Sequence, residues 1–295
     1  MNKKLLNLYG LKFNPFAQNV PAAALLATPA IENFCWRIEQ QIGEGGFALT
    51  TGDPGSGKSA ALRILAERLS AVRDLCVGLL TRLRLGEAAR IDHTSRLCRG
   101  VARPQANLAD FYRELGHLFG VPLSPHNRWN SSKVLREKWL THIDASVHRP
   151  VLLVDEAQEM NASVLSELRL LASAELDSRS LLTIILAGDQ RLLSRLEELD
   201  LLPIASRIRS RLRLETHSPK QLHDCLTHLL KAAGNTQLLT PSLLTTLCEH
   251  AAGNLRLLMN LANDLLAAAC HQERELIDEK LYFEVFALDP KPKKS

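Results

Sequence analysis

The stretch Gly52-Asp53-Pro54-Gly55-Ser56-Gly57-Lys58-Ser59 decides the fold expected for this chain. It matches the pattern G-x-x-x-x-G-K-[ST], whose glycines let backbone N–H groups turn towards a phosphate. An apolar run over residues 47–51 precedes it, and a helical pattern over residues 58–69 follows it. The pattern therefore predicts a buried strand, a phosphate-binding loop and a helix whose positive end faces the loop.

The residue types of this loop predict separate roles. Lys58 is expected to reach the β- and γ-phosphates of a nucleotide, and the Ser59 hydroxyl to hold Mg²⁺. The predicted cofactors are therefore ATP and Mg²⁺. The residues expected to line the nucleotide phosphates are Gly52, Asp53, Pro54, Gly55, Ser56, Gly57, Lys58, Ser59 and Ala60.

A second apolar segment, residues 151–154, ends in the acids Asp155 and Glu156. Asp155 is expected to complete the Mg²⁺ shell, and Glu156 to orient or deprotonate the attacking water. The alternative is an ordinary strand followed by a helix start, where acids are favoured anyway. Together with the phosphate-binding loop, the pair favours a Mg²⁺-dependent ATPase that releases ADP and phosphate.

Three further segments carry polar candidates. The apolar run 181–187 is expected to lie beside the strands over residues 47–51 and 151–154, and it ends in Gly188-Asp189-Gln190. This ending predicts either a polar side chain near the γ-phosphate or a turn with a helix cap. Arg256 opens a C-terminal helix and either approaches the phosphates or lies on the surface. Four arginines follow one another at alternating positions: Arg207, Arg209, Arg211 and Arg213. They form either a solvated face or a contact to a neighbouring subunit's site.

The order of the elements predicts the domain organisation. Strands alternate with helices over residues 29–217, and helices follow alone over residues 218–288. This pattern is typical of an α/β domain with a parallel sheet flanked by helices, followed by a small all-α lid domain. Residues 1–28 are expected to be irregular, and residues 289–295 to form a basic tail.

One segment of the α/β region has little periodicity. Residues 82–103 carry six arginines against two acids, and residues 83–102 are interpreted as a basic insertion loop. A tolerated surface loop and a DNA-facing loop both fit this composition. The segment lacks the interleaved aromatic residues that a base-stacking surface would carry.

The composition of the chain is that of an ordinary globular protein. It has 295 residues, 46% hydrophobic content, 23% charged residues and a formal net charge of +4, which permits a nucleic-acid partner without requiring one. The six cysteines stand singly, without a C-x-x-C pair, and the N-terminus lacks a long apolar segment. These features predict reduced thiols, a cytoplasmic location and no membrane partner.

Taken together, these segments resemble the AAA+ ATPases, and more narrowly their ExeA-like branch. The narrower resemblance rests on Tyr9-Gly10-Leu11-Lys12-Phe13-Asn14-Pro15-Phe16 and on Leu229-Leu230-Lys231-Ala232-Ala233-Gly234. It implies that Arg207, or second Arg211, is the arginine finger and that Arg256 is the second sensor. It further implies a first sensor at Asp189 or Gln190, and that the Phe13–Phe16 segment within residues 1–28 packs near the adenine.

The same resemblance implies two alternative functions. The branch includes ATP-dependent helper proteins of Mu-like and Tn7-like transposons, which implies a homo-oligomeric ring or helical filament on duplex DNA that selects a target and engages a transposase. It also includes the ATPase of general secretion protein A, which implies a cytosolic ATPase acting on protein partners. Secretion-type relatives continue into a membrane segment and a peptidoglycan-binding region, whereas the sequence ends at Ser295, which favours the first expectation.

Overall fold

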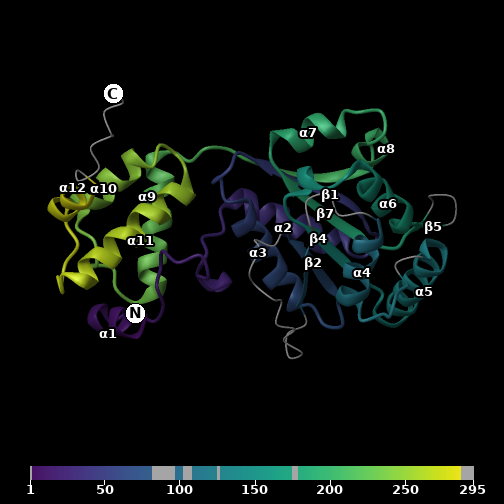
Figure 1. Cartoon of the computed structure of the whole chain (residues 1–295), viewed down its shortest axis with the longest axis horizontal. Helices are drawn as coiled ribbons and strands as arrows, with labels where there is room; N and C mark the ends of the chain where they lie inside the picture. The colour runs from purple at the N-terminus through teal and green to yellow at the C-terminus, as the bar shows by residue number, and fades with distance from the viewer. Residues whose placement is uncertain (1, 82–96, 102–107, 125–126, 175–178, 287–295) are drawn as a thin grey trace, which may run out of the picture. The chain divides into compact units, whose positions relative to one another are not determined.

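A computed structural model describes residues 2–81, 97–101, 108–124, 127–174 and 179–286 (Figure 1). Contacts within the chain divide it into two compact units. One unit comprises Met1–Leu26, Pro54–Gly57 and Glu215–Ser295, and the other comprises Ala27–Asp53 and Lys58–Leu214.

The second unit is built on a six-stranded sheet in the order β3-β2-β4-β7-β1-β8. All neighbouring strands of this sheet run parallel, which confirms the predicted fold class. The strands are β1 (Gly46–Gly52), β2 (Val77–Thr81), β3 (Leu97–Val101), β4 (Val151–Val154), β7 (Thr183–Gly188) and β8 (Ile208–Leu214). A two-stranded antiparallel pair, β5 (Ser173–Ala174) and β6 (Arg179–Ser180), lies outside it.

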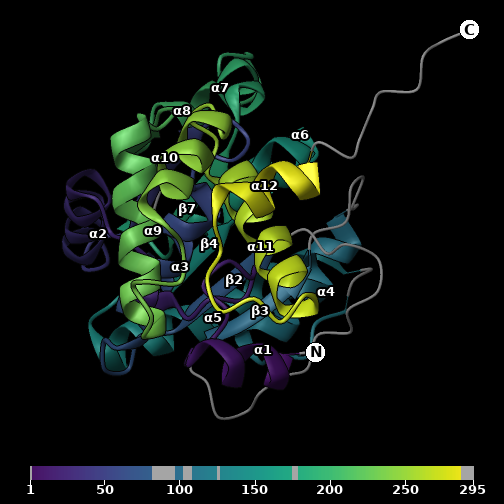
Figure 2. The same cartoon turned by 90° about the vertical axis from the view of Figure 1, so that its left-hand side faces the viewer.

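Helices cover both faces of this sheet (Figures 1 and 2). Leu152 and Ile184 lie in one core with residues of α4, α5, α6, α7 and α8. Leu153 and Ile185 alternate with them along the strands and are fully buried on the opposite face, where α3 contacts β1, β2 and β7. The helices are α2 (Pro29–Gln41), α3 (Lys58–Ser70), α4 (Leu108–Phe119), α5 (Arg128–Ser146), α6 (Ala162–Ala172), α7 (Gln190–Leu196) and α8 (Leu202–Ala205). Burial on two faces explains why β4 and β7 read as unbroken apolar runs.

Two edge strands differ from the sequence-based expectation. Leu97–Val101, inside the predicted insertion 83–102, forms β3 and pairs with β2 at one edge of the sheet. The other residues of that predicted loop lie outside the described ranges. At the opposite edge, the alternating arginine segment forms β8 beside β1. Its alternation of exposed Arg211 and Arg213 with buried Leu212 is the period-2 pattern of a half-buried strand.

The first unit is helical. It contains α1 (Asn2–Tyr9), the 3₁₀ turn η1 (Ala22–Ala24), α9 (Pro219–Ala233), α10 (Pro241–His250), α11 (Leu255–His271) and α12 (Glu279–Phe286). The expectation that residues 1–28 are irregular is wrong for α1. Leu5 and Tyr9 are each 4% exposed and belong to the core that α9–α12 form, and α1 packs on α11. Packing of an apolar face stabilises a helix too short to form alone.

The segment Tyr9–Phe16 belongs to this helical core. The Tyr9 hydroxyl donates to the Arg274 carbonyl at 2.8 Å, and the Lys12 amide donates to the Ala233 carbonyl at 2.9 Å. Phe16 is 3% exposed within the same core. The two short motifs that carry the narrower sequence resemblance, 9–16 and 229–234, are therefore in contact with each other. The placement of Phe13–Phe16 near an adenine stays a prediction.

The sequence predicts a basic C-terminal tail and no membrane partner. The predicted basic tail, 289–295, lies outside the described residues. None of the helices within the described ranges combines the length and the apolar composition that crossing a bilayer requires.

Candidate nucleotide-binding site

The predicted phosphate-binding loop connects the end of β1 to the start of α3. Gly55 has φ of +88° and Gly57 has φ of +98°, in the left-handed region that favours glycine. A side chain at either position would strain the turn. The loop therefore has the conformation that turns backbone N–H groups towards a bound anion at a helix N-terminus.

The Lys58 ammonium group lies against this loop. Lys58 is 7% exposed, and its Nζ donates to the carbonyls of Gly52 at 2.7 Å and Asp53 at 3.0 Å. The Ser56 hydroxyl is buried and has no hydrogen-bond partner among the described residues. A buried cation and an unsatisfied hydroxyl in one loop fit a phosphate group, which supplies acceptors to both.

The structure brings Ser59 and Asp155 together. The Ser59 hydroxyl, in the first turn of α3, donates to Asp155 Oδ2 at 3.1 Å. Asp155 follows β4 directly, and its amide still donates to the Leu80 carbonyl of β2 at 2.9 Å. Hydroxyl and carboxylate oxygens are the ligands that Mg²⁺ prefers, so the pair fits this cation.

Burial controls the ionisation of Asp155. Removal of the carboxyl group from water raises the pKa of Asp155, and the nearby negative charge of Glu156 raises it further. Hydrogen bonds from the Ser59 hydroxyl and the Glu156 amide, and the charge of Lys58, oppose these effects only in part. A divalent cation would remove this penalty, which is a second feature that fits Mg²⁺.

The strand order explains why distant segments share one edge of the sheet. β7 pairs with β4 on one side and with β1 on the other, with Val154 opposite Leu186 and Thr51 opposite Gly188. The expectation that the 181–187 strand lies beside the other two is therefore confirmed. Since parallel strands end at the same edge, the phosphate-binding loop, the acidic pair and Asp189 all follow strand ends there.

Glu156 has an unusual backbone conformation. Its φ is +54° and its ψ is 41°, in the left-handed region where non-glycine residues are uncommon. The 3₁₀ turn η2 (Ala157–Glu159) follows it directly. One oxygen of the Glu156 carboxylate accepts a hydrogen bond from the side-chain amide of Gln158. The carboxylate of Glu156, the candidate base, is therefore held by Gln158 of the turn that follows it.

Asp189 forms the helix cap that the sequence left open as an alternative. Its carboxylate accepts from the Arg191 amide at 2.9 Å and from the Arg191 guanidinium, so it begins α7. Burial alone would raise the pKa of Asp189, but the bonds from Arg191 more than offset it, and the pKa is lowered. Gln190 is exposed. Contact of either residue with a γ-phosphate stays a prediction.

The candidate arginines occupy different elements. A guanidinium nitrogen of Arg207, between α8 and β8, donates to the Pro203 carbonyl. Arg211 is exposed on β8 at the position opposite Leu49 of β1. Arg256 is exposed near the start of α11, in the helical unit. Their roles as finger residues and second sensor stay predictions.

Sequence reasoning missed three residues around the acidic turn. Gln158 binds Glu156, the Arg195 guanidinium donates to the Gln158 carbonyl at 2.6 Å, and Arg191 links Asp189 to Glu159 at 2.8 Å and 2.9 Å. Gln158 had a signal in the sequence, because it is a polar residue two positions after the acidic pair. The partners from α7 had none, since only the fold places them there.

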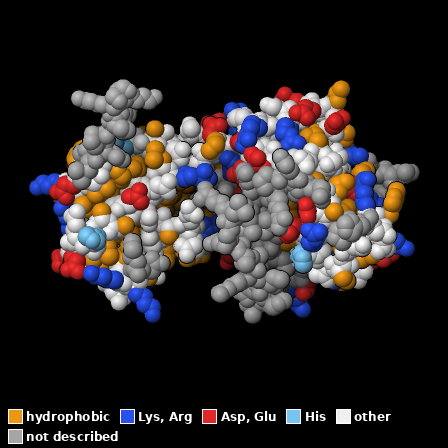
Figure 3. All heavy atoms as spheres, in the orientation of Figure 1, with side chains coloured by type: hydrophobic (Ala, Val, Ile, Leu, Met, Phe, Trp, Pro, Cys, Tyr) orange, Lys and Arg blue, Asp and Glu red, His pale blue; other side chains and the backbone are white. Residues whose placement is uncertain are grey.

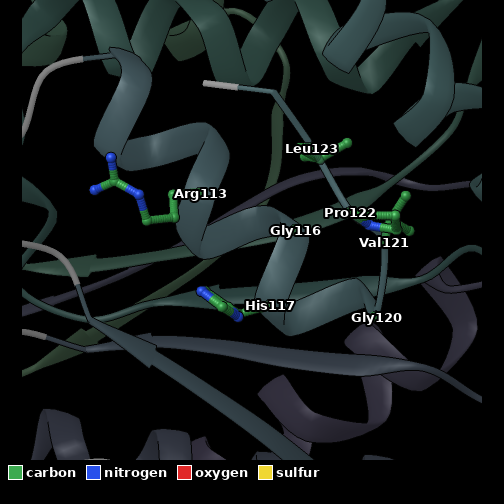
Figure 4. A pocket seen from close by; sticks show the side chains of 7 residues that line it. All are labelled: Arg113, Gly116, His117, Gly120, Val121, Pro122 and Leu123. Carbon is green, nitrogen blue, oxygen red and sulfur yellow. The ribbon is translucent and has the colours of Figure 1, made fainter. Parts of the chain in front are cut away.

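A surface hollow of about 500 Å³ lies elsewhere in the same unit (Figure 4). It is formed by the end of α4 and the segment that follows. Its lining residues are Arg113, Gly116, His117, Gly120, Val121, Pro122 and Leu123. None of them is a predicted site residue, so the hollow is separate from the nucleotide site.

The parallel sheet, the glycine loop and the Ser59–Asp155 pair together define a P-loop nucleotide-binding protein. The family described as AAA domain matches residues 40–196, more than half of the chain. The chain therefore belongs to the AAA domain family.

The chain is also similar to individual proteins. The chain is 28% identical over 229 residues to General secretion pathway protein A of Aeromonas hydrophila, covering 76% of this chain and 37% of that protein. It thus spans less than half the length of that relative.

Three solved structures have the same fold. Drosophila ORC bound to DNA has a TM-score of 0.67 at 18% identity, covering 96% of this chain and 65% of that chain. ORC2 of Aeropyrum pernix, in ADPNP–ADP complexes, has a TM-score of 0.67 at 16% identity, covering 93% and 71%. Domain III of Thermotoga maritima DnaA has a TM-score of 0.60 at 16% identity, covering 95% and 100%. At these identities the structural likeness establishes the fold alone.

Proposed function

We propose that this protein binds ATP with Mg²⁺ and hydrolyses it. The observation that carries the proposal is the 3.1 Å hydrogen bond from the Ser59 hydroxyl to Asp155, directly beside Glu156. A Mg²⁺ ion bound by these residues would neutralise charge that develops on the phosphates. The ADPNP–ADP complexes of Aeropyrum pernix ORC2, which has the same fold, support a nucleotide as the ligand.

The chain's own residues divide the work of this reaction. The backbone N–H groups of the glycine loop and the Lys58 ammonium would bind the phosphates, and Ser59 and Asp155 would hold the cation. Glu156 orients a water molecule for in-line attack and accepts its proton. Phosphoryl transfer mainly requires positioning and charge stabilisation, and these residues would supply the part of both that comes from a single subunit.

Substitution of Glu156 tests the proposal. Glu156→Gln removes the base but keeps the size of the side chain, so we expect ATP binding to persist and turnover to fall at least about 100-fold. Glu198→Gln, the same change at an exposed residue, is the matched control and should hydrolyse ATP at the wild-type rate. Wild-type turnover by Glu156→Gln would show that Glu156 is not the base. Wild-type protein without Mg²⁺-dependent turnover would refute the proposed activity.

We further propose that hydrolysis is coupled to a homo-oligomer, a ring or a helical filament, in the cytoplasm. Relatives suggest two kinds of partner. Similarity to General secretion pathway protein A supports a protein partner in an assembly process. The Drosophila ORC structure is bound to DNA, which supports duplex DNA. Regulation of transposition, with a transposase as partner, is the finer form of the DNA proposal and rests on the sequence resemblance.

The charge of the described surface bears on these alternatives. On the face shown in Figure 3, Lys and Arg side chains are mixed with Asp and Glu side chains, so the described residues visible there form no single basic patch. Exposed Arg209, Arg211 and Arg213 on β8 are one local concentration of positive charge, although Arg209 pairs with Glu44. In the DNA proposal, exposed arginines such as Arg211 and Arg213 would contact phosphates, so binding would weaken as the salt concentration is raised.

Titration of a fluorescent duplex separates the two kinds of partner. The DNA proposal predicts sequence-independent binding with ATP that weakens as salt is raised from about 50 to 200 mM. Binding that is absent at the lower salt concentration with ATP would exclude it and leave the protein-partner alternative. For the transposition proposal, ATP-dependent binding of an integrase-like transposase on the same duplex is the expected result, and its absence would refute it.

A further inference from the structure

We propose that Gln158 is a positioning residue for hydrolysis, whose side-chain amide ties the Glu156 carboxylate to the end of β7. The proposal rests on the proposed function, in which Glu156 activates the attacking water. Gln158 is 7% exposed and lies in η2, which contacts both β7 and α7. It is thus a buried polar side chain between the candidate base and the strand beside the phosphate-binding loop.

Both ends of the Gln158 amide have a partner. Its Nε2 donates to Glu156 Oε2, and its Oε1 accepts from the Asp189 amide at 3.4 Å. An amide has separate donor and acceptor atoms, and this orientation satisfies both partners, whereas the flipped one satisfies neither. The side chain therefore connects a carboxylate on the β4 side to the main chain that follows β7.

The main chain of Gln158 is held independently. The Arg195 guanidinium of α7 donates to the Gln158 carbonyl at 2.6 Å. The neighbouring Glu159 forms an ion pair with Arg191 of the same helix at 2.9 Å. Because these contacts with α7 hold the main chain of η2 in place, the Gln158 side chain starts from a defined position beside Glu156.

Gly188 makes room for this link. A Cβ atom at position 188 would lie 2.6 Å from Gln158 Oε1 and 2.7 Å from Leu192 Cδ2, closer than side-chain contacts allow. A side chain at position 188 would therefore displace the Gln158 amide and the Leu192 side chain from the positions they hold. The end of β7 is thus shaped to receive Gln158.

The consequence concerns the geometry of the base. Glu156 begins from a left-handed backbone conformation with φ of +54°, so η2 and Gln158 together set where its carboxylate points. Gln158 occupies one carboxylate oxygen and leaves the other to bind water. A hydrogen bond to an ionised acceptor is among the stronger ones, which suits a positioning role. Loss of this bond should change the rate of the chemical step more than the binding of ATP.

Two variants of the same size test the link. Gln158→Met removes both hydrogen bonds, and Gln158→Glu keeps an acceptor for the Asp189 amide but loses the donor to Glu156. We expect both to lower kcat at least about tenfold, with the KM for ATP changed less than about twofold. Gln40→Met, at an exposed glutamine of α2, is the matched control and should leave both unchanged.

A double-mutant cycle separates positioning from a structural role. In the Glu156→Gln background, Gln158→Met should cause no further loss of single-turnover rate, because the base it positions is gone. An additional tenfold loss there, or wild-type kcat in both Gln158 variants, would overturn the proposal. Should Gln158→Met fail to fold by circular dichroism, the Gln158→Glu arm of the cycle decides by the same criteria. An inactive wild-type protein would instead refute the proposed function, so the two failures are distinguishable.

Discussion

The Ser59 hydroxyl and the Asp155 carboxylate are 3.1 Å apart, although 96 positions separate them in the sequence. The first turn of α3 supplies one group and the end of β4 supplies the other, with β7 pairing between β4 and β1. The contact joins the helix that follows the phosphate-binding loop to the acidic pair, in which Glu156 would activate water.

Lys58→Ala should abolish tight ATP binding. Its Nζ lies against the carbonyls of Gly52 and Asp53, within the loop that would surround the phosphates. Loss of a charge-assisted contact there should weaken the affinity at least about 30-fold, which corresponds to about 2 kcal/mol. Titration with a fluorescent ATP analogue measures this change. Lys138→Ala, at an exposed lysine of α5, should bind as the wild type does; equal affinities of the two variants would contradict the assignment.

Asp155→Asn should stabilise the protein in metal-free buffer while removing Mg²⁺-dependent hydrolysis. Burial raises the pKa of Asp155 above its ordinary value of 3.8. The folded state therefore binds the proton more tightly than the unfolded state does, and stability is lost as the pH rises from 3.8 through the raised pKa. At neutral pH the ionised carboxylate destabilises the fold.

Thermal unfolding in a chelator measures this effect. At pH 7, Asp155→Asn should raise Tm by about 2 °C, and the difference should shrink as the pH is lowered towards 4. Asp53→Asn, at an exposed residue of the phosphate-binding loop, is the matched control and should not raise Tm at pH 7. A lower Tm for Asp155→Asn at every pH would contradict the prediction.

Arg207→Ala should lose hydrolysis and keep ATP binding. If Arg207 reaches a neighbouring subunit's site, its loss should lower kcat by about 10³-fold, the effect of removing an arginine finger. Arg209→Ala is the matched control, because Arg209 lies two positions away and pairs with Glu44. Full ATP hydrolysis by Arg207→Ala, together with loss of hydrolysis in Arg211→Ala, would assign the arginine-finger role to Arg211.

Mixtures of inactive subunits test whether this arginine acts in trans. Arg207→Ala retains Glu156, and Glu156→Gln retains Arg207, so a mixed oligomer contains interfaces with both groups intact. Partial recovery of hydrolysis on mixing is expected. Failure at every mixing ratio, with both proteins shown to co-assemble, would argue against a trans-acting finger.

Tyr112→Phe should destabilise the α/β unit. The Tyr112 hydroxyl donates to Glu167 Oε1 at 2.5 Å, and the Arg128 guanidinium binds the same carboxylate, which is 3% exposed. Removal of one donor to a buried charge should lower the free energy of unfolding by about 1.5–3 kcal/mol, as denaturant titration would measure. Arg113→Ala, which breaks an exposed pair with Asp110, should change it by less than about 1 kcal/mol. Similar effects of the two variants would show that the buried contact contributes little.

Local patterns predicted most elements and missed those that depend on distant partners. The apolar runs of β1, β4 and β7 stand out because parallel strands are buried on both faces. Helix α1 was missed because its stability comes from packing on α11, which lies near the other end of the sequence. Strand β8 had a local signal, the alternation of arginine with apolar and small residues. The arginines were interpreted as functional candidates, and the two-residue period that indicates a strand was not recognised.

The sequence by itself determined the phosphate-binding loop, the acidic strand end and the parallel α/β class, because each is written in contiguous residues with a fixed backbone requirement. Glycines at 55 and 57 permit positive φ, and apolar runs require burial. Only the tertiary structure decided that β8 closes the sheet beside β1, that Asp189 caps α7, and that Gln158 joins Glu156 to the end of β7. These relations depend on which strands become neighbours, and strand order is a property of the whole folded sheet rather than of any one segment.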